Sequence, residues 1–165
     1  MALNDIRPHS ASRGGSQHAR AYPMAASATF LRGEPTVLTS GALDECGDDP
    51  DFVAGIAMMR GTDVDGAALA TGSPITVLEL AEDQDFVCNN FATDGAGTAA
   101  TPTQANAIGL LAGFTLNGSD WFVDTGCANL LLEITDVLNS QGISITNPLH
   151  SYNTTGVSVV FKVVT

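Results

Sequence analysis

Histidine is the side chain most often used as a general base near neutral pH, and this chain has three. His9 and His18 lie close to the N-terminus, so only His150 lies in the rest of the chain. A hydrolytic triad needs a histidine beside a nucleophile and a carboxylate behind it. Because His150 follows a turn signal, we expect a surface histidine rather than a base. No glycine-rich loop with a lysine is present. The sequence therefore predicts no catalytic residue and a protein that is not an enzyme.

Carboxylates are abundant and gather in two turn-rich stretches. Residues 44–51 contain five acids, and residues 63–66 read Asp-Val-Asp-Gly. Such clusters suggest calcium, but neither has the third ligand before the glycine and the final glutamate of a twelve-residue calcium loop. We favour solvated acidic turns and predict no metal and no cofactor, with a cation on the acidic loops as the open alternative.

The three cysteines lie far apart along the chain, at Cys46, Cys88 and Cys127. No close pair of the kind found in zinc sites is present, and an odd number argues against a disulfide scaffold. We expect three buried free thiols.

Charge is divided unevenly in this chain of 165 residues, whose formal net charge is −12. Residues 1–32 carry four arginines and one acid, whereas residues 33–165 carry seventeen acids and two bases. The first 25 residues also contain few large apolar side chains. We therefore expect an extended basic N-terminal arm over residues 1–25 and a body over residues 26–165. The arm is either a tether that binds an acidic partner surface or a frayed terminus. Four arginines without interleaved aromatic residues, on an acidic body, argue against nucleic acid as a partner.

Short apolar segments separated by Gly, Pro and Asp predict strands from residue 28 onward. The expected strands are residues 29–32, 36–39, 52–58, 75–80, 86–88, 114–116, 121–123, 143–146 and 157–164. We expect Pro35 to form a hinge at a sheet edge, and Gly55 to allow a close backbone approach within a buried strand. The single tryptophan, Trp121, is expected to anchor the core.

Two pairs of these strands have the signature of hairpins. Residues 75–80 and 86–88 flank a short polar link, and residues 114–116 and 121–123 flank Asn117-Gly118. The Asn-Gly pair favours a turn in which both of its residues have positive φ.

One segment has apolar residues at helical spacing, namely Leu130, Leu131, Ile134, Val137 and Leu138. Asn129 could cap such a helix and Gly142 could end it, so we predict an amphipathic helix near residues 129–140. The expected fold is all-β, a small β-barrel or sandwich of short strands, with this one helix and the extended N-terminal arm.

No apolar run reaches the length of a membrane span, and the first residues lack the apolar stretch of a secretory signal. We therefore expect synthesis in the cytoplasm and no membrane partner.

Four motifs in order suggest a family. The strings AYPMAASATFLRGEPTVL, GALDECGDDPDFVAGIAM, PITV and DWFVD begin at residues 21, 41, 74 and 120. Together with the basic arm, they resemble the head decoration, or cement, proteins of tailed bacteriophages. The resemblance runs from about Ala21 to the end of the chain.

The resemblance implies a non-enzymatic structural protein of the virion, with a β-rich and usually trimeric body on the outer capsid surface. Its arm would bridge neighbouring major capsid proteins and so stabilise the expanded shell. On this hypothesis the arginines pair with capsid carboxylates and the apolar residues fill shallow pockets. The expected capsid-binding residues are Leu3, Ile6, Arg7, Arg13, Arg20 and Tyr22. The alternative is a carbohydrate- or host-surface-binding module displayed on the virion.

Overall fold

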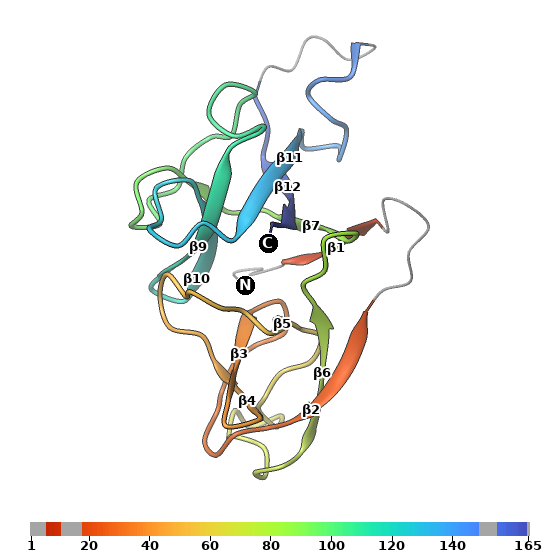
Figure 1. The fold of residues 1–165 in the computed structure, drawn as a ribbon, viewed down its shortest axis with the longest axis vertical. Helices are drawn as coiled ribbons and strands as arrows, with labels where there is room; N and C mark the ends of the chain where they lie inside the picture. The colour runs from red at the N-terminus through yellow and green to blue at the C-terminus, as the bar shows by residue number, and fades with distance from the viewer. Residues whose placement is uncertain (1–5, 11–17, 149–154, 165) are drawn as a thin grey trace.

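The computed structural model describes residues 6–10, 18–148 and 155–164. Almost all regular structure in these residues is β, in two sheets that are not closed into a barrel. The all-β prediction is therefore confirmed, and the architecture is sandwich-like. Figure 1 shows the larger sheet in the upper half of the molecule and the smaller sheet in the lower half.

The larger sheet has seven strands in the order β1-β7-β12-β11-β9-β10-β8. Their bounds are β1 Arg7–Ser10, β7 Asp85–Cys88, β8 Phe91–Ala92, β9 Leu111–Asn117, β10 Asp120–Asp124, β11 Leu132–Leu138 and β12 Ser158–Val163. The smaller sheet has five strands in the order β2-β6-β5-β3-β4. Their bounds are β2 Ala19–Pro23, β3 Pro35–Thr39, β4 Ala42–Glu45, β5 Gly55–Ala57 and β6 Pro74–Glu79.

The main core joins the two sheets. Ile56 of β5 and Leu78 of β6 belong to the same buried cluster as the phenylalanines of the larger sheet. Within it, the Phe114 ring lies edge-on to Phe161 at 5.7 Å and to Trp121 at 6.5 Å between ring centroids. Edge-to-face contacts of this kind stabilise a core beyond the area they bury. Trp121 is 3% exposed, which confirms its predicted place in the core.

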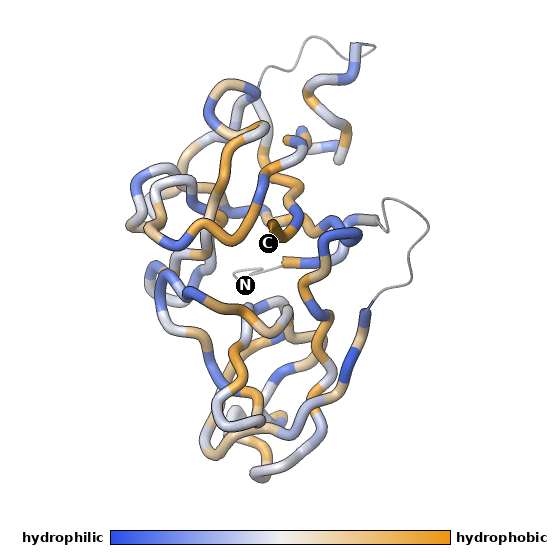
Figure 2. The backbone as a smooth tube through the Cα atoms, viewed as in Figure 1, coloured by the Kyte–Doolittle hydropathy of each residue, from blue (hydrophilic) through white to orange (hydrophobic). Residues whose placement is uncertain are grey.

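A second apolar cluster fills the smaller sheet. Its buried members are Met24, Ala28, Phe30, Leu43, Ala57, Ile75 and Val77. Figure 2 shows apolar segments concentrated in the strands, whereas most outer loops are pale or blue. Gly55 makes the expected close approach, since a Cβ at this position would lie 2.5 Å from the backbone oxygen of Leu78.

The predicted hairpin around Asn117 is confirmed as β9 and β10, which pair from Asn117 opposite Asp120. The register places Gly118 and Ser119 at the centre of the turn. Gly118 has a φ of 66°, and Asn117 is not among the residues of positive φ. The predicted turn residues were therefore shifted by one position.

The predicted amphipathic helix is wrong, because residues 132–138 form β11 between β9 and β12. A register shift between Ile134 and Asp136 marks a β-bulge. The bulge adds one residue to the strand, so Leu132, Ile134 and Val137 all reach the main core. These apolar residues are two and three positions apart, and this spacing resembles the apolar pattern of an amphipathic helix.

The predicted hairpin of residues 75–80 with 86–88 is also wrong, because β6 and β7 belong to different sheets. Residues 80–84 carry the chain from one sheet to the other. Residues 29–32 form no strand, and residues 143–146 contribute only a single bridge at Ser144. Pro35 begins β3, an inner strand, rather than an edge strand.

Candidate docking surface

The described parts of the predicted arm are strands of the protein's own two sheets. Arg7 and Pro8 of β1 pair with Val87 and Phe86 of β7. All five residues of β2 pair with β6. Residues 6–10 and 18–25 therefore belong to the folded body, at the right-hand side of Figure 1.

The structure separates the residues expected to bind a capsid. Ile6 is 3% exposed and packs in the main core, so its side chain cannot fill a pocket on a partner. Arg7 lies in β1, and Arg20 and Tyr22 lie in β2. Leu3 and Arg13 lie outside the described residues. Burial of Ile6 removes apolar surface from water, which favours the packing of residues 6–10 against the rest of the protein.

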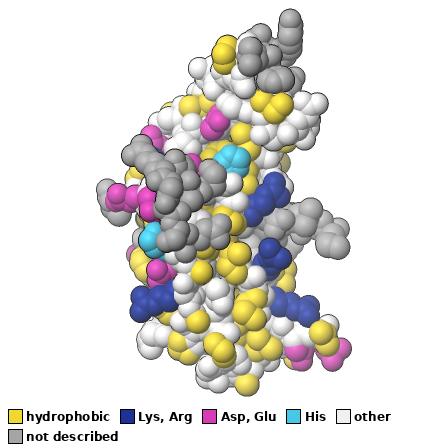
Figure 3. Space-filling model, turned by 90° about the vertical axis from the view of Figure 1, so that its right-hand side faces the viewer, with side chains coloured by type: hydrophobic (Ala, Val, Ile, Leu, Met, Phe, Trp, Pro, Cys, Tyr) yellow, Lys and Arg dark blue, Asp and Glu magenta, His cyan; other side chains and the backbone are white. Residues whose placement is uncertain are grey.

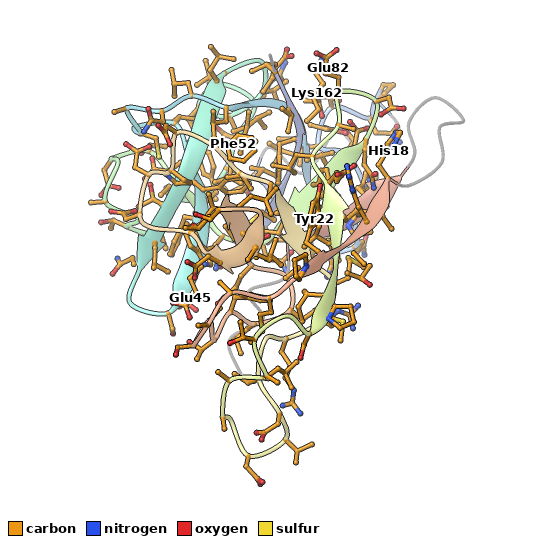
Figure 4. All side chains as sticks on the ribbon, turned by 60° about the horizontal axis from the view of Figure 1, so that its bottom comes forward. His18, Tyr22, Glu45, Phe52, Glu82 and Lys162 are labelled. Atoms are coloured by element: carbon orange, nitrogen blue, oxygen red, sulfur yellow. The ribbon has the colours of Figure 1, made fainter. Side chains whose placement is uncertain are left out.

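β2 is an edge strand with an exposed basic and aromatic face. The guanidinium of Arg20 lies 5.1 Å from the centre of the Tyr22 ring, and its Nη1 lies 3.6 Å from Oε1 of Glu79. The Tyr22 hydroxyl donates to the same carboxylate oxygen, at 2.5 Å. Figure 4 shows Tyr22 beside β6 and His18 at the start of β2. These contacts hold the Arg20 and Tyr22 side chains in place on the surface.

The hydrogen bond to Glu79 also affects the ionisation of Tyr22. Donation to this carboxylate is the main cause that raises the pKa of the Tyr22 hydroxyl above its ordinary value, and partial burial adds to it. The phenol keeps its proton and donates it to Glu79, so its ring surface and the acceptor capacity of its oxygen remain for a partner.

The backbone of β2 presents hydrogen-bonding groups on the side away from β6. The carbonyl of His18 accepts from Glu79, and the N–H of Met24 donates to Ser73. Because antiparallel strands alternate the direction of their backbone groups, those of Ala19 and Ala21 point outward. Both alanines are exposed and small. This edge can therefore accept a further extended segment.

The face that contains β1, β2 and β6 gathers basic side chains. In Figure 3, Lys and Arg side chains lie across the middle and lower parts of this face, with apolar side chains between them. Acidic side chains lie mostly nearer its edges. Some of the six Lys and Arg side chains of this acidic chain thus lie on one face, among apolar side chains.

A groove of about 310 Å³ lies between the part of the molecule that holds the smaller sheet and the part that holds the larger sheet, and the sequence did not predict it. Glu34, Glu45, Phe30 and Leu31 line it from one side, and Leu116 and Trp121 line it from the other. Glu34 accepts from the N–H of Leu31 at 2.8 Å, and Glu45 accepts from the N–H and hydroxyl of Thr29. Burial raises the pKa of the Glu34 carboxyl, and the charge of Glu45 adds to this effect. Both carboxylates thus bind the loop that precedes β3.

The acidic loop after β4, which follows the smaller sheet, forms hydrogen bonds with residues of the half that contains the larger sheet. Asp49 accepts hydrogen bonds at 3.1 Å from the N–H groups of Ala128 and Asn129, and Asp48 accepts from Leu116 at 2.8 Å. The interpretation as solvated turns misses this role, because these bonds join residues about 70 to 80 positions apart. In the part of the chain that the structure describes, no group of three His, Cys, Asp or Glu residues could hold a metal ion.

The three cysteines are buried and free, as expected. Burial raises the pKa of Cys46 to about 12 and those of Cys88 and Cys127 to about 11. Thiols of this kind are poor nucleophiles at neutral pH. Of the histidines, His18 lies 3.4 Å from the Asp83 carboxylate, and His150 lies outside the described residues.

Comparisons with known proteins give no family for this chain. No family model matches it, and neither the curated proteins nor the solved structures include a match. Within the described residues, no helix is long and apolar enough to cross a membrane.

Proposed function

We propose that this protein is a non-enzymatic decoration protein that binds the outer surface of an icosahedral phage capsid. The observation that carries the proposal is the exposed edge strand β2, with Arg20 and Tyr22, on a face where Lys and Arg side chains lie among apolar ones. The motif order from residue 21 onward, which resembles head decoration proteins, supports the same function.

The charge distribution suits such a role. A body of strong negative charge keeps free copies soluble and mutually repelling, while a basic face gives them one adhesive side. An exposed ion pair contributes only about 0.2–1 kcal/mol. A trimer at a local threefold position would engage three such faces at once, so weak contacts would combine into tight binding. The major capsid protein and two further copies of the chain are the partners in this proposal.

Preferential binding to the expanded shell gives the stabilisation. A ligand that binds one state and not another stabilises that state by mass action. Each bound protein that contacts two neighbouring capsid subunits would oppose their separation under the outward pressure of packaged DNA. In this proposal β2 and the basic face, rather than a free arm, make the contact.

Binding of a carbohydrate is the competing function. The side chain best suited to stack against a sugar ring is Trp121, which is 3% exposed and packs edge-on against Phe114. Of the two functions, the structure therefore lends more support to capsid binding.

The experiment is co-sedimentation of the purified protein with expanded capsids of its phage, at low and high salt. Deletion of residues 1–25 is a poor test, since it removes β1, β2 and the buried Ile6 and Met24. We therefore choose Arg20→Glu, which reverses one exposed charge, and Lys162→Glu as the matched control. Lys162 lies on β12 of the other sheet, paired with Glu133 at 3.0 Å (Figure 4).

We expect Arg20→Glu to lower occupancy of the shell and to weaken its salt dependence, because an attractive contact becomes repulsive. Lys162→Glu should bind as the native chain does. Equal occupancy for all three proteins would exclude the β2 face as the docking surface. Binding of a glycan, with no binding to shells, would favour the competing function.

A further inference from the structure

The hairpin of β9 and β10 contains the single Asn-Gly pair of the chain, Asn117-Gly118. Asn117 is the last residue of β9 and pairs with Asp120, so Gly118 and Ser119 form the tip of the turn. Asn117 and Gly118 are both exposed, and a Cβ added at Gly118 would have no atom within 4 Å. Water and hydroxide ions therefore reach both residues.

The main-chain nitrogen of Gly118 is free to react. Its N–H forms no hydrogen bond with the described residues, and glycine has no side chain to shield it. Asn117 is held by its pairing with Asp120 and by a hydrogen bond of 3.1 Å from its Nδ2 to the carbonyl of Gly97. Only these contacts at the end of the hairpin must open before the Asn117 side chain can turn toward Gly118. Strand ends open locally at little cost.

We propose that Asn117 is a site of spontaneous deamidation. The Gly118 nitrogen attacks Cγ of Asn117 and forms a C–N bond, the Cγ–Nδ2 bond breaks, and ammonia leaves with the proton that the Gly118 nitrogen gives up through solvent. Water then opens the cyclic imide. Hydrolysis at Cγ leaves an aspartate, whereas hydrolysis at the main-chain carbonyl leaves an isoaspartate, in which the main chain runs through Cγ. This inference concerns the chemistry of the hairpin and does not depend on capsid binding.

Asn139 provides a comparison within the same chain, because the small residue Ser140 follows it. Its side chain is 5% exposed, and its Oδ1 accepts hydrogen bonds from the N–H groups of Gln141 at 2.8 Å and Ile143 at 3.1 Å. These bonds fix the carboxamide, and burial keeps water from it. The folded chain should therefore react at Asn117 and not at Asn139.

The product would carry a new negative charge at a position that tolerates it poorly. Asn117 lies directly opposite Asp120, whose Oδ1 is shielded and has no hydrogen-bond partner among the described residues. Like charges at directly opposite positions of antiparallel strands destabilise the pair. The donor to the Gly97 carbonyl would also be lost. The neighbouring N–H of Leu116 donates to Asp48 at 2.8 Å, so the change falls beside a hydrogen bond between the two halves.

The experiment is incubation of the full chain in a mildly alkaline buffer, with and without urea. Peptide mapping by mass spectrometry locates each exchange of an amide for a carboxyl, and enzymatic methylation of isoaspartate identifies the second product. In the folded chain we expect both products at Asn117 and none at Asn139. In urea Asn139 should react as well. A folded chain that stays unmodified at Asn117 while the unfolded chain reacts there, or equal rates at the two residues in the folded chain, would overturn the proposal.

Two variants separate the reaction from its consequence. Asn117→Gln keeps an amide but would have to close a larger ring, so it should stay unmodified; modification at the native rate would place the event elsewhere and refute the assignment. Asn117→Asp reproduces the charge of the product, and we expect it to unfold at a lower urea concentration than Asn117→Gln. Equal midpoints would refute the destabilising effect of the new charge.

Discussion

Truncation of Ile6 to alanine tests whether the N-terminal segment belongs to the fold. The Ile6 side chain is 3% exposed and packs in the main core beside residues of both sheets. Removing the equivalent atoms of a fully buried Ile or Leu costs about 2–5 kcal/mol, since transfer free energy is lost and a cavity remains. In a domain of this length, each kcal/mol lowers the melting temperature by about 2–4 °C. We therefore expect a decrease of roughly 4–20 °C for Ile6→Ala.

Urea denaturation measures the change in free energy of unfolding and a thermal scan measures the melting temperature, both followed by fluorescence of Trp121, because the single tryptophan lies in the same core. Val64→Ala is the control, since Val64 is 83% exposed and its truncation should change the free energy of unfolding by less than about 0.5 kcal/mol. If Ile6→Ala were as mild as Val64→Ala, residues before β1 would not be part of the core. A free N-terminal arm would then again be the candidate for docking on a partner.

Three further predictions concern packing, pH and thiol chemistry. Gly55→Ala should destabilise by about 1–3 kcal/mol in urea denaturation, because its Cβ would meet the backbone oxygen of Leu78 at 2.5 Å; native stability would contradict the close approach. Folding raises the pKa of the Glu34 carboxyl. The contribution of this group to stability is therefore fully present below the unfolded pKa, where the carboxyl is protonated, and is lost as pH rises through the folded pKa. Glu34→Gln should therefore be more stable than the native chain at pH 7, and this advantage should vanish below about pH 4; an advantage that grew on acidification would refute the sign. The three thiols, with pKa values of about 11 to 12, should resist alkylation at pH 7 until urea unfolds the chain; rapid modification of the native protein would show that one of them is accessible.

The sequence was most informative where structure is local. The hairpin of β9 and β10 depends on a tight turn and two adjacent apolar strands, so its prediction needed no knowledge of the rest of the chain. The buried Trp121 and the buried free cysteines followed from composition and spacing. These features are set by residues close together in the sequence or by side-chain type alone.

Non-local features could not be read in the same way. Because of the bulge in β11, the side chains of Leu132, Ile134 and Val137 lie on the same face of the strand. Only the register with β12 reveals the bulge. A polar link between two strands likewise has the same composition whether the chain makes a hairpin or crosses to another sheet. The two halves are joined through Asp48 and Asp49, whose partners are distant in sequence.

The N-terminal segment shows how composition can mislead about backbone structure. Charge segregation drew attention to the N-terminal arginines, and Arg20 lies on an exposed edge strand, but its role in docking stays a prediction. The low apolar content of residues 1–25 suggested a free arm, yet backbone hydrogen bonds add β1 and β2 to the sheets without large apolar side chains. One buried residue, Ile6, gives β1 its place in the core.

Electron cryo-microscopy of expanded capsids saturated with the protein tests the proposed function most directly. Trimeric density on the outer surface is expected, with β2 and its Arg20 facing acidic side chains of the major capsid protein across a joint between subunits. Density in which β2 faces solvent, or shells that remain undecorated at saturating protein, would contradict it.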